Sequence, residues 1–521
     1  MQKKITKKSS YNFHPYLFAF FMVLSLYGYN KDLINPSYAF WPTVIVLFFA
    51  IFTNLFFILT VKKKDKAAIL SSIFIFTFLS FGHYVKLPFL LFQELPVENL
   101  SYYLSFILWL VVIFFCFFQI KKSKRNFSKI SFYLNLFSII LVFISFTSIF
   151  FYELKSKTAS ELINDVNTQN KEDKNDDTYK PDIYYIVLDG FARQDILKEI
   201  YNADNSNFVS SLENLGFFVA SQSTSNYPQT YLSISSTLNM QYLDDVVLNM
   251  GEKSTDRGPL RKIIKDNQVY KTLKEKGYTF VSFPYTWTGT ANNQHTDIFM
   301  QNQIGLGEFG DLLIDLTPLS IFARKNLQFQ QHRNIILHTF DTMPKVAAIQ
   351  EPTFTYTHIL APHPPFVFEE NGEPTDIGGR MYGNDGSHYF EFHPDKEEYR
   401  TRYAKQTTFI AKKTLQMVKG ILANSEKKPV IILQSDHGPG LNLEWEDEEK
   451  TNMQERFGIL NAYLLPTNEN TKLYEDITPV NSFRVIFNNI FDSDYKLLPD
   501  KNYFARWNSP YKHINVTSEV R

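Results

Sequence analysis

Residues 182–190 read Asp-Ile-Tyr-Tyr-Ile-Val-Leu-Asp-Gly, a short and nearly continuous apolar run that ends in an acidic residue and a glycine. This is the pattern of a strand buried on both faces of a parallel sheet. We therefore interpret 182–188 as a buried strand that delivers Asp189 at its carboxyl end. Because an Asp-Gly pair after a strand is most often a turn, this stretch predicts the fold and does not by itself predict a site.

Further apolar runs and helical patterns alternate along the rest of the chain. The runs lie at 278–283, 353–359, 429–434 and 459–465, and the helical patterns include 205–215, 267–276, 398–421 and 479–490. Alternating strands and helices predict an α/β domain with a mostly parallel sheet. In such sheets, ligands bind beyond the carboxyl ends of the strands.

Three strand ends carry polar side chains that can bind a metal. The first strand ends in Asp189. The strand 353–359 contains His358 and leads into Ala361-Pro362-His363-Pro364-Pro365-Phe366, and the strand 429–434 leads into Ser435-Asp436-His437-Gly438. A parallel sheet would bring these two carboxylates and at least two imidazoles to one edge. Mixed oxygen and nitrogen ligands of this kind suit Zn²⁺ or Mn²⁺.

The first 152 residues have a different pattern of apolar residues. They contain five apolar stretches, at about 15–30, 39–61, 67–85, 101–120 and 130–152. Most approach the ~20 residues needed to cross ~30 Å of hydrocarbon. A cleaved signal peptide is the competing interpretation of the first stretch, but no small-x-small cleavage site follows it. Apolar core helices of a soluble protein would not explain the lengths or the alternating loops.

The charges are distributed unevenly. The whole chain has 53 Lys+Arg and 53 Asp+Glu, which excludes a strongly basic nucleic-acid binder and an acidic disordered chain. Residues 1–152 hold 15 Lys/Arg and 4 Asp/Glu, a net of +11, whereas the remainder holds 38 and 49, a net of −11. The basic residues gather in the N-terminal tail and in the loops around 62–66 and 121–129. The positive-inside rule therefore predicts a cytoplasmic N-terminus, five crossings and an extracytoplasmic domain after Tyr152.

The segment 153–180 is rich in Lys, Glu, Asp, Asn and Thr, and we interpret it as a solvated linker. We thus expect a transmembrane domain at 1–152, a linker at 153–180 and an extracytoplasmic catalytic domain at 181–521. Cys116 is the single cysteine, so no internal disulfide can form. Its place in an apolar stretch favours an inert packing or lipid-facing role.

The motifs of the second half resemble a known family. In chain order they are the strand with Asp189-Gly190, then Ser225-Asn226-Tyr227-Pro228-Gln229-Thr230-Tyr231-Leu232-Ser233, His363-Pro364-Pro365-Phe366 and Ser435-Asp436-His437-Gly438. They resemble the alkaline phosphatase superfamily in its sulfatase-like branch. The architecture is similar to membrane phosphoglycerol and phosphoethanolamine transferases such as lipoteichoic acid synthase, which place an extracytoplasmic catalytic domain after five membrane helices. The resemblance covers about 181–490 and implies an alkaline-phosphatase-like domain.

Three more segments are typical of this branch: Asn239-Met240-Gln241-Tyr242-Leu243, Glu455-Arg456-Phe457-Gly458 and Thr478-Pro479-Val480-Asn481-Ser482-Phe483-Arg484. The resemblance also implies roles. Asp189, Asp436 and His437 would bind a divalent metal, Thr230 would be both ligand and nucleophile, and His363 would approach the substrate phosphate. The chemistry is sound, because a metal lowers the pKa of a hydroxyl and neutralises a phosphate oxygen.

Thr230 is preferred as nucleophile over the neighbouring hydroxyls of Thr224, Ser225, Ser233 and Ser235. It follows Asp189 by 41 residues and heads a predicted helix at 231–240, whose N-terminus would favour phosphate. The alternative is that Thr230 is merely the N-cap of that helix.

Departures from the family narrow the prediction. The pattern C/S-x-P-x-R that formylglycine sulfatases need is missing at 226–230, so sulfate hydrolysis by that route is not expected. The only histidine after the Asp-His pair is His513, in a polar tail, which favours one tightly held metal ion (Mn²⁺ or Zn²⁺, with Mg²⁺ as a third option) over two. Asp189 stands where the membrane transferases often have Glu.

Substrate contacts are predicted for Trp287, His295 and His358, with loop packing as the alternative for the first two and a core histidine for the third. His388 and His393 are expected to be solvated.

The leading hypothesis is a transferase of the cell membrane that takes a head group from a phospholipid donor and passes it to a glycan or lipid acceptor. Its catalytic domain would face the periplasm or the cell surface, and no nucleic acid is involved. A metal-dependent phosphodiesterase, phosphatase or sulfatase-like hydrolase is the alternative, and a non-catalytic membrane assembly protein is the third.

Overall fold

The computed structural model describes residues 12–30, 39–85, 98–164, 180–283, 295–300, 307–323, 327–375, 384–391, 393–466 and 472–520. The chain divides into two compact units. A helical unit comprises 1–155 together with 304–328, and an α/β unit comprises 156–303 and 329–521. The segment 304–328 thus groups with the helices, although the sequence pattern assigned it to the catalytic domain.

The helical unit is built from the predicted apolar stretches. Its helices are α1 (His14–Tyr29), α2 (Phe40–Val61), α3 (Lys64–Leu79), α4 (Phe81–Tyr84), α6 (Glu98–Lys122) and α7 (Ser128–Asn164). Three of the described helices are long and apolar enough to cross a membrane, within 40–61, 103–122 and 128–150. The helices α1 and α3 have 16 residues each, fewer than the ~20 that a full crossing needs.

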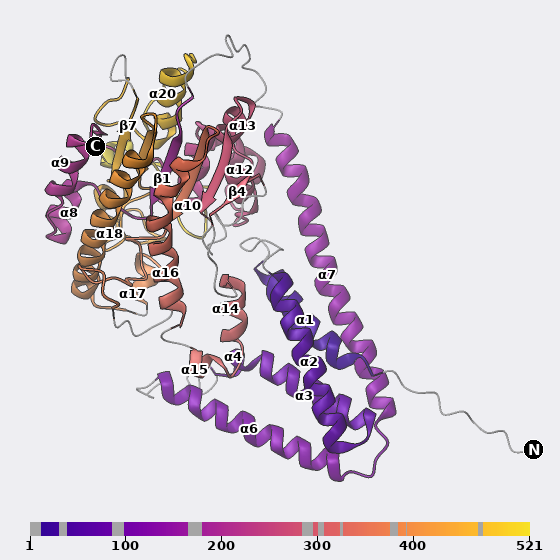
Figure 1. Cartoon of the computed structure of the whole chain (residues 1–521). Coiled ribbons are helices and arrows are strands. Elements are labelled where there is room, and N and C mark those ends of the chain that lie inside the picture. The colour runs from indigo at the N-terminus through magenta and orange to yellow at the C-terminus, as the bar shows by residue number, and fades with distance from the viewer. Residues whose placement is uncertain are drawn as a thin grey trace, which may run out of the picture. The chain divides into compact units, whose positions relative to one another are not determined.

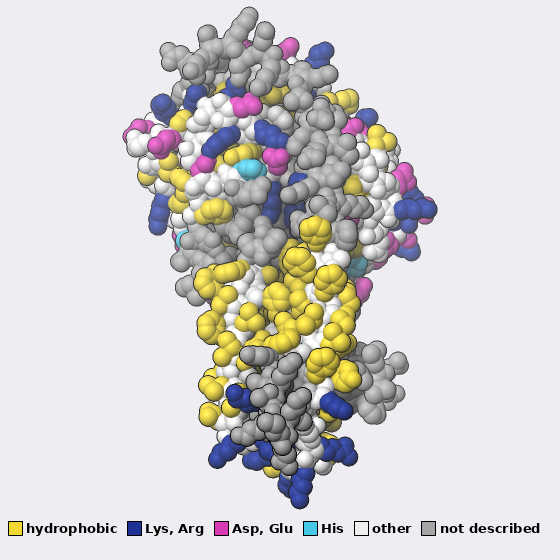
Figure 2. Space-filling model, turned by 90° about the vertical axis from the view of Figure 1, so that its right-hand side faces the viewer, with side chains coloured by type: hydrophobic (Ala, Val, Ile, Leu, Met, Phe, Trp, Pro, Cys, Tyr) yellow, Lys and Arg dark blue, Asp and Glu magenta, His cyan; other side chains and the backbone are white. Residues whose placement is uncertain are grey.

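The surface of the long helices is apolar. Large hydrophobic side chains stand exposed along them, such as Phe48 and Phe52 on α2, Phe115 on α6 and Phe143 on α7. Figure 2 shows hydrophobic side chains gathered in a band on one face, with Lys and Arg side chains at one end of it. An exposed apolar surface of this extent indicates contact with lipid.

Two short helices of the segment 304–328 pack on this bundle: α14 (Gly307–Asp315) and α15 (Ser320–Ala323). Phe309 and Leu313 of α14 are buried in one cluster with Ala19, Val46 and Leu79. Val46 and Leu79 lie toward the ends of α2 and α3 that are remote from the lysines at 62–66.

Gly82 allows the segment that follows α14 to approach the bundle closely. The backbone N–H of Gly82 donates to the carbonyl of Leu316 at 3.1 Å. A Cβ atom on Gly82 would lie 2.6 Å from the carbonyl oxygen of Asp315. Any side chain at position 82 would therefore push the segment away from the bundle.

The expectation of a linker at 153–180 is wrong in its first part. The helix α7 continues without a break to Asn164. The residues 165–179 lie outside the described part of the chain. Charged residues thus extend a helix here instead of ending it.

The α/β unit contains one large sheet. Its strands are β1 (Ile183–Leu188), β2 (Phe218–Val219), β3 (Thr279–Phe283), β4 (Ile298–Phe299), β5 (Thr353–Ile359), β6 (Val430–Gln434) and β7 (Asn461–Leu464). Their order is β2-β7-β6-β1-β5-β3-β4. The mostly parallel α/β sheet is confirmed: among its described strands only β7 is reversed, because it pairs antiparallel with both of its neighbours, β6 and β2. The strand β1 lies at the centre, parallel to both β5 and β6.

Helices cover both faces of the sheet. Side chains of β1 alternate between two cores: Tyr184, Ile186 and Leu188 join one, while Ile183, Tyr185 and Val187 join the other. The first core is closed by α8 (Gln194–Tyr201), α9 (Ser206–Asn214), α16 (Leu327–Thr342) and α18 (Lys396–Asn424). The second is closed by α10 (Thr230–Asn239), α12 (Gly258–Lys265), α13 (Gln268–Glu275) and α20 (Pro479–Phe491). Figure 1 shows α18 running along the first face. Burial on both sides explains the continuous apolar sequence of β1.

Smaller elements complete the unit: η3 (Met343–Ala348), α11 (Asp244–Met250), α17 (Ser387–Phe390), α19 (Met453–Phe457), α21 (Thr517–Val520) and a two-stranded sheet of β8 (Tyr503–Phe504) and β9 (Ile514–Asn515).

Candidate active site

The candidate site lies at the carboxyl ends of β6, β1 and β5, which are neighbours in the sheet. Backbone hydrogen bonds join the loops that follow these strands. The N–H of Asp189 donates to the carbonyl of Ile359 at 3.0 Å, and the N–H of His363 donates to the carbonyl of Asp189 at 3.0 Å. The N–H of Gly190 donates to Asp436 Oδ1 at 3.3 Å. These hydrogen bonds join the three loops to one another.

Glycines follow both the aspartate and the Asp-His pair for steric reasons. Gly190 has a φ of +69°, in the left-handed region that residues with a side chain seldom adopt. A Cβ atom on Gly438 would lie 2.0 Å from the carbonyl oxygen of Glu455. The Asp-His-Gly motif thus includes a position where only glycine fits.

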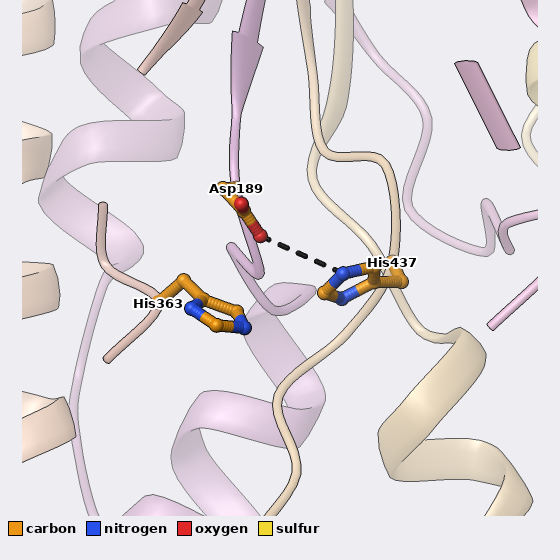
Figure 3. Close-up of side chains that lie close together, drawn as sticks. All are labelled: Asp189, His363 and His437. Carbon is orange, nitrogen blue, oxygen red and sulfur yellow. Dashed lines mark ion pairs between the residues drawn. The ribbon is translucent and has the colours of Figure 1, made fainter. Parts of the chain in front are cut away.

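Two overlapping groups of side chains could hold a metal ion. Asp189, His363 and His437 form one, and Asp189, His358 and Asp436 form the other. In each group the ligand atoms lie within 4.8 Å of one another. Figure 3 shows Asp189 and both imidazoles of the first group turned toward a common space, with the ion pair between Asp189 and His437 drawn as a dashed line.

Backbone carbonyls orient the two imidazoles of the first group. Nδ1–H of His437 donates to the carbonyl of Gly438 at 2.9 Å, and Nδ1–H of His363 donates to the carbonyl of Pro364 at 2.7 Å. Since a carbonyl can only accept, Nε2 of the neutral His437 ring is left with a lone pair. His437 Nε2 lies 3.3 Å from Asp436 Oδ2 and 3.6 Å from Asp189 Oδ1. This tautomer is the one that a metal-ligating histidine needs.

Two buried carboxylate oxygens test whether the residues fit a metal. Asp189 Oδ1 and Asp436 Oδ2 have no hydrogen-bond partner among the described residues. A buried carboxylate oxygen without a partner is costly. A divalent cation beside both oxygens and His437 Nε2 would remove that cost, and this donor set suits Zn²⁺ or Mn²⁺. The residues therefore fit a divalent metal.

The charges of the site support ionised carboxylates. Burial opposes the ionisation of Asp189, but the positive charges of His363 and His358 outweigh it and hold its pKa well below the usual value. Burial lowers the pKa of His437, with a further contribution from the nearby Arg456. A neutral His437 and an ionised Asp189 are the protonation states in which both bind a metal.

Thr230 lies next to this cluster. It is the first residue of α10, and its Oγ1 is 3.2 Å from His437 Nε2. The residue in the N-cap position is Gln229, in extended conformation, so the alternative that Thr230 merely caps the helix is wrong. In the described part of the chain, no hydrogen bond joins the other candidate hydroxyls to the cluster; for example, Thr224 accepts from Asn502, and Ser235 donates to the carbonyl of Leu260.

Three predicted substrate contacts have different outcomes. His358 lies in the cluster, with Nε2 at 3.2 Å from Asp189 Oδ2. His295 does not: it precedes β4, against the ring of Tyr270 and 3.8 Å from Asp266. It therefore stands near the amino ends of the parallel strands, on the edge opposite to the site. Trp287 falls outside the described residues.

Other histidines also differ from expectation. His513 does not lie in a polar tail, because its ring packs 5.0 Å from that of Tyr227, and burial lowers its pKa to about 4. His388 is half-buried and stacks on Trp445.

The sequence interpretation missed two charged residues of the site. Asp385 Oδ2 lies 3.7 Å from His363 Nε2 and 2.5 Å from Nη1 of Arg456. Asp385 comes from an insert with no regular pattern, so no sequence signal marked it. Arg456 stood in a segment typical of the family, but nothing assigned it a role.

No protein-family model matches the chain, and no curated protein matches it. Among solved structures, the chain is similar to the C-terminal periplasmic domain of EcEptC from Escherichia coli in complex with Zn, with 12% identity and a TM-score of 0.43 over 66% of this chain and 94% of that one. It is also similar to the C-terminal periplasmic domain of phosphoethanolamine transferase EptC from Campylobacter jejuni, with 8% identity and a TM-score of 0.37 over 60% and 90%.

A third similar structure is the phosphonate monoester hydrolase of Agrobacterium radiobacter, with 12% identity and a TM-score of 0.41 over 62% of this chain and 80% of that one. These proteins are of the superfamily that the sequence motifs resemble. At such TM-scores the likeness by itself decides no activity, so the function has to come from the residues of the site.

Proposed function

We propose that the protein is a metal-dependent membrane phosphotransferase. It would move a phospho-alcohol head group, phosphoglycerol or phosphoethanolamine, from a phospholipid to a glycan or lipid of the cell envelope. The observation that carries the proposal is the Thr230 hydroxyl, 3.2 Å from His437 Nε2 and beside a cluster in which two carboxylate oxygens have no hydrogen bond among the described residues. A hydroxyl next to a metal site is the arrangement that an activated nucleophile requires.

The residues of the site would have different roles. Asp189, Asp436, His437 and Thr230 would hold one divalent ion, with His358 beside them, and the ion would lower the pKa of the hydroxyl and neutralise a phosphate oxygen. His363 presents Nε2 to the same space from the neighbouring loop. Asp189 and Asp385 raise the pKa of His363 against the effect of burial, so its charge is available to a phosphate oxygen.

The reaction has two balanced halves. In the first, Thr230 Oγ1 bonds to the lipid phosphorus, the bond from phosphorus to the diacylglycerol oxygen breaks, and the threonine proton ends on diacylglycerol. In the second, a hydroxyl oxygen of the acceptor bonds to phosphorus, the bond to Thr230 breaks, and the proton of the acceptor returns to the threonine. Splitting one transfer into two displacements at a fixed nucleophile is ordinary covalent catalysis.

The helical unit supports a lipid substrate. We infer that all five apolar stretches cross the cell membrane, with α1 and the pair α3–α4 as the short members of the bundle. The loop lysines favour a cytoplasmic N-terminus, which would put the α/β unit in the periplasm or at the cell surface. A catalytic unit tethered to the bilayer meets phospholipid head groups at high effective concentration.

The test uses the full-length protein in detergent micelles with Mn²⁺ or Zn²⁺ and fluorescent phosphatidylglycerol or phosphatidylethanolamine. We expect metal-dependent release of fluorescent diacylglycerol. Thr230→Ala should abolish it while metal analysis shows the ion still bound. Ser233→Ala, which removes a hydroxyl one turn further along α10, is the matched control and should keep the activity. Equal activity of Thr230→Ala and the unchanged protein would disprove the nucleophile assignment.

Product analysis separates transferase from hydrolase. With a candidate glycan present, a transferase yields a modified glycan, whereas a phosphodiesterase yields the free phospho-alcohol with water as acceptor. A protein that binds no Mn²⁺ or Zn²⁺ and releases no diacylglycerol would instead favour a non-catalytic assembly role.

A further inference from the structure

The guanidinium of Arg456 is buried in the α/β unit, with the residue 1% exposed. Arginine is almost never fully buried unless its charge is paired. Its donors go to three loops. Nε and Nη2 donate to the carbonyl of Pro228 at 2.9 and 2.6 Å, and Nη1 donates to the carbonyl of Gly438 at 2.8 Å and to Asp385 Oδ2 at 2.5 Å.

Each of the three partners adjoins a working residue of the candidate site. Pro228 precedes Thr230 by two residues, and Gly438 directly follows His437. Asp385 Oδ2 lies 3.7 Å from His363 Nε2. One side chain therefore joins the nucleophile loop, the metal-ligand loop and the loop that faces His363.

Asp385 is fixed as firmly as Arg456. Its Oδ1 accepts from the hydroxyl of Tyr399 on α18 at 2.9 Å, and its backbone carbonyl accepts from the indole N–H of Trp445 at 2.8 Å. A Cβ atom on Gly440 would lie 2.4 Å from Asp385 Oδ1, so the loop after the Asp-His pair closes directly over this carboxylate. The carboxylate cannot turn without disturbing these groups.

We propose that Arg456 and Asp385 form a positioning pair, which sets the spacing between Thr230, His437 and His363 during catalysis. The inference rests on the proposed function for its kinetic part. Both residues act through others: Arg456 directs its donors at protein groups and lays its guanidinium over the ring of Trp445, at 5.0 Å from the centroid.

A purely structural ion pair is the competing explanation, and it makes a different prediction. Replacing a buried ion pair by apolar residues is often neutral for stability, whereas removing one partner is costly because a charge is left uncompensated. A structural pair would therefore show its whole effect as lost stability. A positioning pair would show lost turnover and weaker metal binding at temperatures where every variant is folded.

The experiment compares Arg456→Met, Asp385→Asn and the double variant as full-length protein in detergent. Thermal unfolding sets a temperature at which all are folded, calorimetry measures Mn²⁺ and Zn²⁺ affinity, and diacylglycerol release gives kcat and KM. We expect Arg456→Met to lower kcat about 10²-fold with KM changed less than about threefold, because misplaced reacting groups cost this much. Its metal affinity should fall about tenfold, as is typical when a group that orients a ligand is lost.

Two further variants sharpen the test. Arg456→Lys should not restore kcat, since a single ammonium cannot reach Pro228, Gly438 and Asp385 together. Arg484→Met is the matched control: this arginine also donates to two carbonyls, of Met240 and Lys496, but away from the site. It should lower the melting temperature and leave kcat and metal affinity unchanged.

The double variant is decisive. If it regains the stability lost in the single variants yet keeps the low kcat and the weaker metal affinity, the pair positions the site. If folded variants keep normal kcat and normal metal affinity, the positioning role is overturned. If the unchanged protein releases no diacylglycerol, the proposed function fails, and metal affinity alone then decides whether Arg456 holds the His437 loop in place.

Discussion

A buried histidine of the helical unit and two buried carboxylates of the α/β unit have opposite surroundings. In the helical unit, the buried His14 of α1 makes hydrogen bonds to Ser72 of α3 at 2.6 Å and to Ser131 of α7 at 3.0 Å. At the sheet edge of the α/β unit, Asp189 Oδ1 and Asp436 Oδ2 are buried without a hydrogen bond among the described residues. Polar groups that satisfy one another hold helices together, whereas unsatisfied carboxylates mark a place for a ligand.

The largest effect is expected from a substitution of Asp436, one of the two carboxylates that lack a hydrogen bond at the sheet edge. Asp436→Asn keeps the shape of the side chain and can keep the bond from the Gly190 N–H, but it removes a negative ligand oxygen. We expect metal binding to be lost and diacylglycerol release to fall at least about 10³-fold. Without metal, the unfolding temperature should stay the same or rise, because the buried charge that is lost has an oxygen, Oδ2, without a hydrogen bond among the described residues. A metal-free Asp436→Asn protein that unfolds earlier would contradict the comparison.

The next effect concerns close packing behind the site. Gly438→Ala would place a methyl group 2.0 Å from the carbonyl of Glu455, and we expect a loss of about 3 kcal/mol or more in the free energy of unfolding. Gly28→Ala in the helical unit is the matched control, because its Cβ would make ordinary contact with Ile149 at 3.6 Å. Urea unfolding followed by tryptophan fluorescence measures both. Equal effects at the two glycines would remove the steric explanation of the motif.

A third prediction concerns the hydrogen bonds of His14 in the helical unit. His14→Leu leaves the hydroxyls of Ser72 and Ser131 without their partner, and we expect the helical unit to lose about 1–3 kcal/mol. Metal affinity, measured by calorimetry, should stay within about twofold, because no group of the α/β unit changes. A large loss of metal affinity would show that the network does more than join helices.

The smallest expected effect depends on pH. His513 has its pKa lowered by burial from 6.5 to about 4, so the unfolded chain binds more protons than the folded one between these values. Stability should therefore rise with pH across that window, and this contribution should be complete above about pH 6.5. His513→Phe should flatten the stability curve between pH 4 and 6.5. An unchanged slope would assign the pH dependence to other groups.

Much of the fold followed from local patterns. Five strands could be predicted from continuous apolar runs: β1 at 183–188, and β3, β5, β6 and β7. Burial on both faces of the sheet explains these runs, because it removes the usual alternation of apolar and polar side chains along a strand. The segment after the last membrane helix was misread, since α7 continues to Asn164 although its last turns are polar. Charge composition does not stop a helix that has already formed.

The site was predictable where its residues directly follow strands. Asp189, Asp436 and His437 were found this way, and the structure brings them together with Thr230, which lies on a helix that begins beside them. Their assignment as ligands and nucleophile stays a prediction until metal binding is measured. His295 was misplaced because a histidine near a strand can stand at either edge, and only the direction of β4 decides which.

The sequence by itself determined the two textures of the chain, the positions of most strands and helices, and the polar groups at three strand ends, because periodicity and length are local properties. Only the tertiary structure decided that β1 lies between β5 and β6, that α14 packs with the helices of the helical unit, and that Asp385 meets Arg456 beside His363. These contacts join residues far apart in the chain, and their partners are chosen by packing and charge compensation in three dimensions, which no local pattern records.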